Sequence, residues 1–357
     1  MICKMSDAPG NGGGTMQALL LKEGYVLDVC EVGTRAPLID EVTVRVEAVG
    51  ICGSDVHGVA SRSPRRMPPL IMGHELVGEV VAAGGAAGEP LIGRHVAVNP
   101  QVPCGLCPDC RSGRENVCGQ RELIGGTRAG GLAELVCVPV RCLHPVSGDL
   151  APEVAVFAEP LATCVHALSL VPERFPETVV VLGAGTIGVL AAQALRLAGV
   201  GRIIVSESDE ERRASARPVA DDVVAPDELL GNVFEQSRLG VTLSVDAVGS
   251  AQTRRQSLEV LQSGGVSIWL GMNEQEGAIP AFDVVVREQR VQGAFAYTDR
   301  EFERAVRLLE GGLITPAVPL GFFTLEESSE VFNGLLEGKA NGFLKAVISS
   351  QSSPTRN

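Results

Sequence analysis

The stretch that decides the fold is Val179-Val180-Val181-Leu182-Gly183-Ala184-Gly185-Thr186-Ile187-Gly188. Its β-branched start is typical of a buried parallel strand, and the residues that follow predict a helix over Ile187–Leu197. Between them stands the pattern G-x-G-x-x-G. Its first glycine makes a tight turn, its second lets a pyrophosphate approach the backbone, and its third lets helix and strand pack. Free N–H groups at the helix start would bind the phosphates, so we expect Gly183, Gly185, Thr186, Ile187 and Gly188 to bind a dinucleotide.

The same region, from Val179 to Val200, is apolar for long enough to cross a bilayer. Its glycines divide it into a strand-like and a helix-like part, which favours a buried strand and packed helix over a membrane span. The N-terminus lacks the apolar core of a signal peptide, and Gly10 to Thr15 predict a flexible tail. We therefore expect a cytoplasmic protein without a membrane partner.

Three further short apolar runs follow, namely Ile203–Val205, Val241–Val245 and Val266–Leu270. Enough residues separate neighbouring runs to form crossover helices, and this alternation predicts an α/β fold with a parallel sheet. An amphipathic segment from Phe302 to Leu309 then leads into a strand-like tail, Gly342 to Ile348.

Glu207 follows the second run, about 20 residues after Gly188, where an acid hydrogen-bonds the adenosine ribose. Its negative charge would repel a 2′-phosphate, so NAD is expected rather than NADP. Arg212 would stack on the adenine or, alternatively, bind a phosphate. Val248 and Leu270, near the ends of the last two runs, complete the expected cofactor-binding residues.

The composition excludes several classes of function. The chain has 357 residues, enough for about two domains, with 45% hydrophobic and 20% charged residues, so its bulk should fold. Its 30 Lys and Arg against 43 Asp and Glu give a net charge of -13, which a nucleic acid would repel. From Gln17 to about Val140, short alternating strands such as Val42–Val46 and frequent Gly and Pro predict a loop-rich antiparallel β domain.

Four of the ten cysteines, Cys104, Cys107, Cys110 and Cys118, have the spacing C-x2-C-x2-C-x7-C. In a reducing compartment such clustered thiols indicate a metal more often than disulfides. Four thiolates fill the tetrahedral shell of zinc and leave no open position, so we expect a structural zinc that holds its loop together. A disulfide pair or an iron–sulfur cluster is the alternative.

Three other motifs contain residues that could form a catalytic zinc site: Cys52-Gly53-Ser54-Asp55-Val56-His57, Gly73-His74-Glu75-Leu76-Val77-Gly78 and Glu159-Pro160-Leu161. Taken singly, Cys52 reads as a core residue, His74 as a hydrogen-bonded histidine and Glu159 as a helix cap. Taken together they supply thiolate, imidazole and carboxylate ligands. Three such ligands with one open position are typical of a catalytic zinc that binds water or an alcohol oxygen.

Together these motifs resemble those of the zinc-dependent medium-chain dehydrogenases/reductases, the alcohol and polyol dehydrogenase family, from Met16 to Ile348. The resemblance implies a GroES-like β-rich catalytic domain over residues 16–156, to which the C-terminal residues 297–357 return. It implies a Rossmann NAD-binding domain with a doubly wound parallel sheet over residues 157–296. It also implies a homodimer or homotetramer formed through the Rossmann sheets.

Within that family, Glu159 in place of a cysteine resembles the sorbitol, butanediol and threonine dehydrogenase branch. The resemblance makes Glu75 the expected fourth zinc ligand, or else a residue just behind the metal. Gly58 stands where an aromatic residue is common, and Ala296 where an arginine is common. We expect both positions to line a widened substrate pocket.

The expected reaction is reversible hydride transfer between a secondary alcohol (a polyol, cyclitol, vicinal diol or amino alcohol) and NAD. Ser54, two residues after a zinc ligand, would take the hydroxyl proton, and His57 would pass it to solvent. The alternatives are a simple secondary or primary alcohol dehydrogenase, a non-catalytic nucleotide-binding relative of the same fold, and a cysteine-rich nucleic-acid module. The net charge argues against the last of these.

Overall fold

The computed structural model describes residues 11–171, 177–339 and 342–349. It forms two compact units, one within residues 1–159, 305–311 and 320–357, the other within 160–304 and 312–319. The domain limits expected from the resemblance place residues 297–304 and 312–319 with the first part, whereas this division places them with the second. α4 (Ala158–Ser169) and α10 (Asp299–Glu310) contribute residues to both units.

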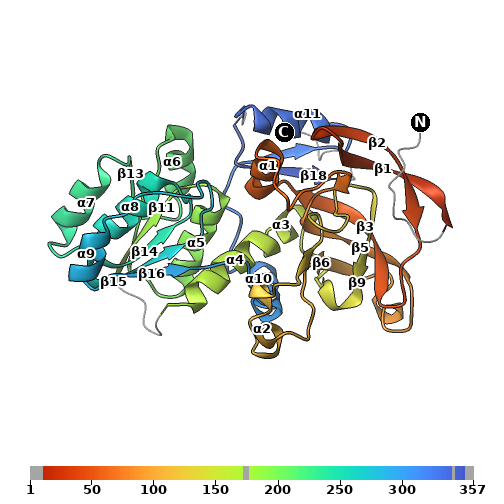
Figure 1. Cartoon of the computed structure of the whole chain (residues 1–357), viewed down its shortest axis with the longest axis horizontal. Helices are drawn as coiled ribbons and strands as arrows, with labels where there is room; N and C mark the ends of the chain where they lie inside the picture. The colour runs from red at the N-terminus through yellow and green to blue at the C-terminus, as the bar shows by residue number, and fades with distance from the viewer. Residues whose placement is uncertain (1–10, 172–176, 340–341, 350–357) are drawn as a thin grey trace. The chain divides into compact units, whose positions relative to one another are not determined.

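The first unit is rich in antiparallel strands (Figure 1). Its strands are β1 (Asn11–Lys22), β2 (Val26–Arg35), β3 (Glu41–Gly50), β4 (Leu70–Ile71), β5 (Glu75–Ala83), β6 (His95–Val98), β7 (Gln101–Val102), β8 (Glu122–Leu123), β9 (Leu135–Pro139), β10 (Leu143–Pro145), β17 (Leu320–Phe323) and β18 (Lys345–Ser349). Its helices are α1 (Gly53–Ala60), α2 (Pro108–Arg111), α3 (Pro152–Ala155) and α11 (Ser328–Leu336), with short 3-10 helices η1 (Glu89–Leu91), η2 (Glu115–Val117) and η3 (Val140–Cys142).

Strand pairing in this unit places the candidate site. In the main sheet of the described residues the order is β10-β6-β5-β3-β18-β17, and β9 also pairs with β3. β3 pairs with β5 so that Gly50 lies opposite Glu75, and with β18 so that Gly50 lies opposite Val347. The ends of three strands far apart in sequence therefore meet beside the segment that leads to Cys52.

The N-terminal prediction was partly wrong. β1 begins at Asn11 and pairs with β2, with Thr15 opposite Gly33, so residues 11–15 form a strand rather than a flexible tail. Gly10 lies outside the described residues. Hydrogen bonding along β2 gives these small residues a fixed extended backbone, which their composition alone did not indicate.

The second unit contains a parallel sheet with the order β13-β12-β11-β14-β15-β16 in the described residues. Its strands are β11 (Thr178–Leu182), β12 (Arg202–Ser206), β13 (Asp222–Val224), β14 (Val241–Asp246), β15 (Leu261–Trp269) and β16 (Arg290–Gly293). Its helices are α5 (Thr186–Leu197), α6 (Glu210–Ala216), α7 (Leu229–Gln236), α8 (Ala251–Glu259) and α9 (Ala281–Val286). The chain winds outward in both directions from β11, which confirms the predicted doubly wound fold.

The four apolar runs predicted in this part are all strands of that sheet, and the predicted helix is α5. Val180 and Leu182 from β11 pack with Ile204 from β12 and with Leu258 from α8 in the core. Among the helices described in either unit, none combines the length and apolar character that a membrane span needs.

Candidate active site

The glycine motif forms the turn between β11 and α5. Gly183 has a φ of +97°, a left-handed conformation that favours glycine, and its backbone N–H donates to the carbonyl of Ser206. A Cβ at Gly188 would run into the carbonyl oxygen of Gly183, whereas a Cβ at Gly185 would meet nothing within 4 Å. The turn is therefore closely packed at Gly183 and Gly188 and open over Gly185, at the start of α5.

Glu207 lies at this turn, immediately after β12. Its carboxylate is buried and accepts hydrogen bonds from the backbone N–H of Ala184 at 2.8 Å and of Asp209 at 2.9 Å. Asp209 caps α6, whose exposed Arg212 is the nearby cation that the sequence suggested. The glycine turn and the acid expected to bind ribose are thus joined directly.

Val248 and Leu270 lie at the same edge of the sheet. A Cβ on Gly183 would be 2.5 Å from Cγ2 of Val248, and Leu270 donates its backbone N–H to the carbonyl of Asp246, the last residue of β14. Ligands of doubly wound sheets bind at the carboxyl ends of the strands. All the predicted cofactor-binding residues lie at or beside this edge.

The four cysteines of the predicted lobe gather around α2 and η2. Their Sγ atoms are 3.5 Å apart for Cys107 and Cys110, 3.8 Å for Cys107 and Cys118, and 3.9 Å for Cys104 and Cys110. Sulfur atoms at tetrahedral positions about 2.3 Å from zinc are about 3.8 Å apart, so the set fits one zinc ion. A disulfide needs about 2.05 Å, which excludes the disulfide pairing considered above.

The lobe also favours thiolate at one of its cysteines. The backbone N–H groups of Leu106 and Cys107 point at Sγ of Cys104 and lower the pKa of this thiol to about 6. Burial, together with hydrogen bonding to Cys107, raises the pKa of the Cys110 thiol to about 12. Loading four thiolates with a metal therefore displaces protons that the metal-free lobe keeps.

The second group of metal-ligating atoms belongs to Cys52, His74 and Glu75. Cys52 is the extended residue directly before α1, while His74 and Glu75 stand at the start of β5. A ligand atom of each residue lies within 4.8 Å of those of the other two. Sulfur, nitrogen and oxygen donors at this separation fit one zinc ion and leave room for a further ligand.

The carboxylate of Asp55 faces the imidazole of His74. Its Oδ2 lies 3.2 Å from Nδ1 of His74, and both side chains are buried. The remaining ring nitrogen is therefore the one available to a metal. Burial by itself lowers the pKa of His74, but the negative charges of Asp55 and Cys52 outweigh burial and raise the pKa well above its ordinary value.

A buried cation lies beside these groups. Nζ of Lys345, at the start of β18, forms an ion pair with Oε2 of Glu75, while Oε1 of Glu75 has no hydrogen-bond partner within the described part of the chain. Burial alone lowers the pKa of Lys345, but the charges of Glu75, Cys52 and Glu159 raise it. A Cβ on Gly50 would lie 2.8 Å from Cε of Lys345 and would also clash with Glu75, so a glycine there leaves room for the pair.

Glu159 is half-buried near the start of α4 and acts electrostatically on Lys345. It is not part of the group of three ligand atoms, in which Glu75 supplies the carboxylate. The structure thus brings the expected fourth ligand, Glu75, into the group. The role of Glu159 as a zinc ligand stays a prediction.

The two residues predicted to move protons lie on α1. Oγ of Ser54 donates a hydrogen bond to Sγ of Cys52 at 3.2 Å, which places this hydroxyl at the ligand group. His57 is exposed three residues further along the helix, on the same face as Ser54. Their spacing suits transfer from the site toward solvent, and the transfer itself stays a prediction.

Comparison with known proteins gives the family. Residues 39–148 match the alcohol dehydrogenase GroES-like domain and residues 186–311 match the zinc-binding dehydrogenase domain. L-galactonate-5-dehydrogenase from Escherichia coli K12 is 30% identical over 323 residues, which cover 88% of this chain and 95% of that protein. The chain belongs to the zinc-dependent medium-chain dehydrogenases.

Other members of this family are similar over most of their length. L-threonine 3-dehydrogenase from Coxiella burnetii is 27% identical and is matched over 86% of this chain and 92% of its own. A protein of known structure from Sinorhizobium meliloti 1021, described as a zinc-binding dehydrogenase bound to NADP, has a TM-score of 0.87 and 34% identity. That match covers 94% of this chain and 99% of the other.

Three charged residues of this dehydrogenase's candidate site were not assigned a role from the sequence: Asp55, Arg66 and Lys345. Asp55 stands inside the motif that begins at Cys52, so its position offered a local signal. Lys345 reaches the site through the pairing of β18 with β3, and Arg66 through the turn after α1. No local pattern in the sequence indicates either contact.

The prediction that Gly58 widens the substrate pocket was wrong. Gly58 is buried, and a Cβ there would lie 2.9 Å from Cγ of Arg66. We expected open space beside Gly58 because no aromatic side chain stands at this position, but Arg66 fills that space. Ala296 is half-buried with a φ of +51°, a left-handed conformation uncommon for alanine. Whether it faces substrate stays a prediction.

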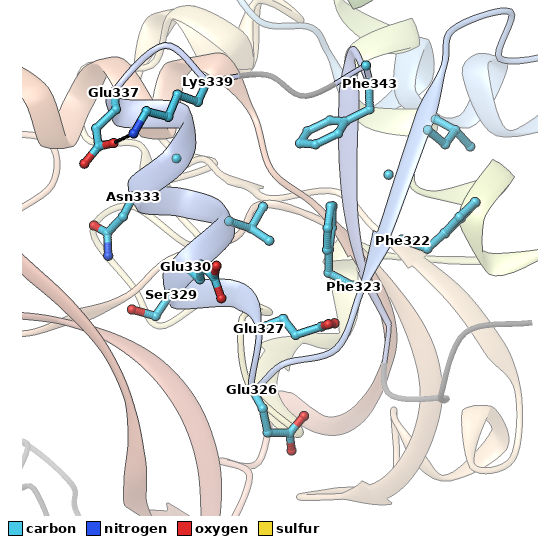
Figure 2. Close-up of a pocket in the computed structure, with 15 residues that line it drawn as sticks. Phe322, Phe323, Glu326, Glu327, Ser329, Glu330, Asn333, Glu337, Lys339 and Phe343 are labelled. Carbon is cyan, nitrogen blue, oxygen red and sulfur yellow. Dashed lines mark hydrogen bonds and ion pairs between the residues drawn. The ribbon is translucent and has the colours of Figure 1, made fainter. Parts of the chain in front are cut away.

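The C-terminal part of the first unit contains a separate pocket of 1090 Å³ between β17 and α11 (Figure 2). Phe323 and Phe343 meet edge to face at one wall, and Glu337 forms an ion pair with Lys339 at another. None of the residues that line it is among the predicted catalytic, metal or cofactor residues. This pocket is therefore not the candidate active site.

Proposed function

We propose that this chain is a zinc-dependent, NAD-linked dehydrogenase that oxidises a secondary alcohol carrying a neighbouring hydroxyl or amino group. The observation that carries the proposal is the convergence of Cys52, His74 and Glu75 within 4.8 Å of one another. Such a mixed set argues against a non-catalytic nucleotide-binding protein, because nothing in the packing of a β domain requires three metal-ligating groups to converge.

Cys52 and His74 would hold the catalytic zinc together with a carboxylate, from Glu75 or Glu159. When bound, zinc lowers the pKa of a substrate hydroxyl, and the nicotinamide accepts the hydride. Asp55 would hold the His74 ring in one orientation, and Ser54, whose hydroxyl donates a hydrogen bond to Cys52, would accept the substrate's hydroxyl proton while passing its own proton on. His57 would then carry that proton to solvent.

The substrate class rests on the acidic character of the site and on the relatives. Glu75 and Glu159 both act on Lys345, so a carboxylate beside the ligand group would be available to a second polar group of a bound substrate. The similar L-galactonate and L-threonine dehydrogenases are named for substrates that carry such groups. Because Arg66 fills the space beside Gly58, of these two positions only Ala296 would widen the substrate pocket.

The experiment is an NAD-linked activity screen of the zinc-loaded enzyme over sugar acids, polyols, cyclitols, vicinal diols, amino alcohols and simple alcohols. We expect the highest kcat/KM for a secondary alcohol with an adjacent hydroxyl or amine. Ethanol as the best substrate would contradict the proposed class. Ala296→Arg should shift selectivity toward open-chain polyols if residue 296 faces substrate, and should leave selectivity unchanged if it does not.

NAD rather than NADP is proposed because the Glu207 carboxylate lies at the glycine turn, where it would repel a 2′-phosphate. The similar S. meliloti protein binds NADP, so the choice requires its own test. We expect wild type to bind NAD more tightly than NADP in titration calorimetry and Glu207→Ser to reduce that preference. A wild-type preference for NADP, or an unchanged preference in Glu207→Ser, would show that Arg212 or another residue selects the cofactor.

We also propose a homo-oligomer that forms through the β16 edge of the parallel sheet. β16 pairs with β15 alone among the described strands, and neighbouring α9 has no buried residue. Phe282, Val285, Val286 and Val291 give this edge exposed apolar side chains. Sedimentation velocity should show at least a dimer, and Val291→Lys should shift it toward monomer. The cytoplasmic location stays a prediction.

A further inference from the structure

We propose that Arg66 is a positioning residue for the metal ligand His74, acting through Asp55, and that Gly58 makes room for it. The inference rests on the proposed function, because it takes His74 to be a zinc ligand. It assigns a specific task to a buried arginine that lies outside all the motifs of the sequence. It also gives a physical reason for a glycine inside a helix.

Arg66 fixes one oxygen of Asp55 and leaves the other facing His74. Its Nε and Nη2 both donate to Oδ1 of Asp55, at 2.9 and 2.7 Å, and both side chains are buried. Oδ2 of Asp55 faces Nδ1 of His74 at 3.2 Å, and neither of these two buried atoms has a hydrogen-bond partner among the described residues. Two donors from one planar guanidinium on one oxygen restrict rotation of the carboxylate.

This restriction matters because the carboxylate sets the direction of the imidazole. A metal-binding histidine depends on the partner of its other ring nitrogen for its tautomer and orientation. Without Arg66, the buried carboxylate of Asp55 would lose the arginine that pairs with it and would be free to turn away from Nδ1. The ring of His74 would then lose its fixed orientation toward Cys52 and Glu75.

The backbone brings Arg66 over Gly58. After α1, Ser63 donates its backbone N–H to the carbonyl of Gly58, and Arg66 donates its own to the carbonyl of Ser63, both at 2.9 Å. The three atoms nearest to a Cβ on Gly58 all belong to Arg66, and Cγ is the closest at 2.9 Å. Gly58 does not have the left-handed conformation that would require glycine. The close approach of the Arg66 side chain thus explains why residue 58 is a glycine.

The first experiment measures metal affinity at the Cys52 site. Wild type, Arg66→Ala, Arg66→Lys and Arg35→Ala are compared by chelator competition with zinc and by the visible spectrum of the cobalt-substituted protein. Arg35→Ala is the matched control, since Arg35 also pairs with a fully buried carboxylate, Glu41, on other strands of the same unit.

We expect Arg66→Ala to bind metal at this site roughly 10–100-fold more weakly and to alter the cobalt spectrum, with partial recovery in Arg66→Lys. Arg35→Ala should lower the Tm without changing either readout. Wild-type affinity and spectrum in Arg66→Ala would overturn the inference while leaving the proposed function in place. Absence of a metal at this site in wild type would overturn both.

The second experiment uses Gly58→Ala, which removes no polar group. In wild type it should lower the Tm and weaken metal binding, because the new methyl group displaces Arg66. In the Arg66→Ala background it should raise the Tm, because alanine is the better helix former once the space is empty. A Tm change of the same sign in both backgrounds would contradict the pairing of Gly58 with Arg66.

Discussion

At the scale of single residues, the ion pair between Glu75 and Lys345 balances the buried charges of the candidate metal site. Both side chains are almost fully buried, and Lys345 also interacts with Cys52 and Glu159. Removing one partner of a buried pair leaves the other uncompensated, which costs more than removing both. Glu75 and Lys345 therefore stabilise the fold at the same place where the catalytic metal is proposed to bind.

This balance gives a mutational prediction. Glu75→Gln should lower the free energy of unfolding by about 3 kcal/mol, because Lys345 keeps its charge without its nearest anion. Adding Lys345→Met should recover part of that loss, since no unpaired cation remains. Urea unfolding of the two single variants and the double variant at one fixed zinc concentration measures the coupling. Purely additive losses would show that the pair does not stabilise the fold as described.

Glu301 gives a prediction on pH. Burial alone raises its pKa, but hydrogen bonds from His166 at 3.0 Å and from the backbone N–H of Thr298 at 2.8 Å lower the pKa to about 2, against 4.5 for an ordinary glutamate. A folded-state pKa below the unfolded value stabilises the fold above pH 4.5, and this contribution is lost as pH falls from about 4.5 toward 2.

We therefore expect Glu301→Gln to destabilise the protein at pH 7 by about 1–2 kcal/mol, after allowance for partial solvent screening. The difference between wild type and variant should shrink as pH falls from 5 to 3. Denaturant unfolding of both proteins across this range measures it. A difference that does not change with pH would mean that the side-chain shape of Glu301, not its charge, stabilises α10.

The residues that sequence reasoning found are those in compact local motifs, such as Cys52, His74 and the four lobe cysteines. The spacing of the four lobe cysteines predicts that they converge on a metal, whereas Cys52 and His74 were found from the combination of separate motifs. Arg66 and Lys345 were not found, because each reaches the site through a contact that the residues next to it in the sequence do not indicate. Buried charge pairs of this kind need the fold before they can be recognised.

At the scale of elements, the cysteine lobe depends on its sulfur cluster. α2 has no buried residue, and η2 buries only Asn116, so little apolar packing holds this loop. Closing the loop with a metal therefore supplies the stability that a core would otherwise give.

Cys107→Ser should accordingly lower the Tm and increase protease cleavage in this loop, with activity lost only as the fold is lost. Cys52→Ser should instead abolish activity with little change in Tm, because Cys52 stands at the open site. Differential scanning calorimetry and initial rates on both variants test the separation. Equal loss of folding in the two variants would contradict distinct structural and catalytic roles.

The elements of the parallel sheet could be predicted where they are fully buried. β11, β12, β14 and β15 are apolar runs, whereas the edge strands β13 and β16 are short and only partly apolar, and they were not predicted. An edge strand is stabilised by hydrogen bonding to one neighbour rather than by burial of its side chains, so hydropathy carries little signal for it.

At the scale of the whole molecule, the chain order differs from the order in space. β18 pairs with β3 although almost the whole chain separates them, and this pairing brings Lys345 to the candidate ligands Cys52 and Glu75. Composition and periodicity predicted a β-rich part followed by an α/β part, but not the return of the C-terminal strand, which came only from the family resemblance. Long-range strand pairing has no local periodic signal.

We expect one chain to hold two zinc ions with separate roles, and zinc content measured together with activity distinguishes the two ions. Purified enzyme should contain two zinc ions per chain. A mild chelator should remove the ion at Cys52 and His74 first, abolish NAD-linked activity while the far-UV circular dichroism stays unchanged, and added zinc should restore the activity. Full activity with a single zinc per chain, or with iron in its place, would rule out two zinc ions with separate roles.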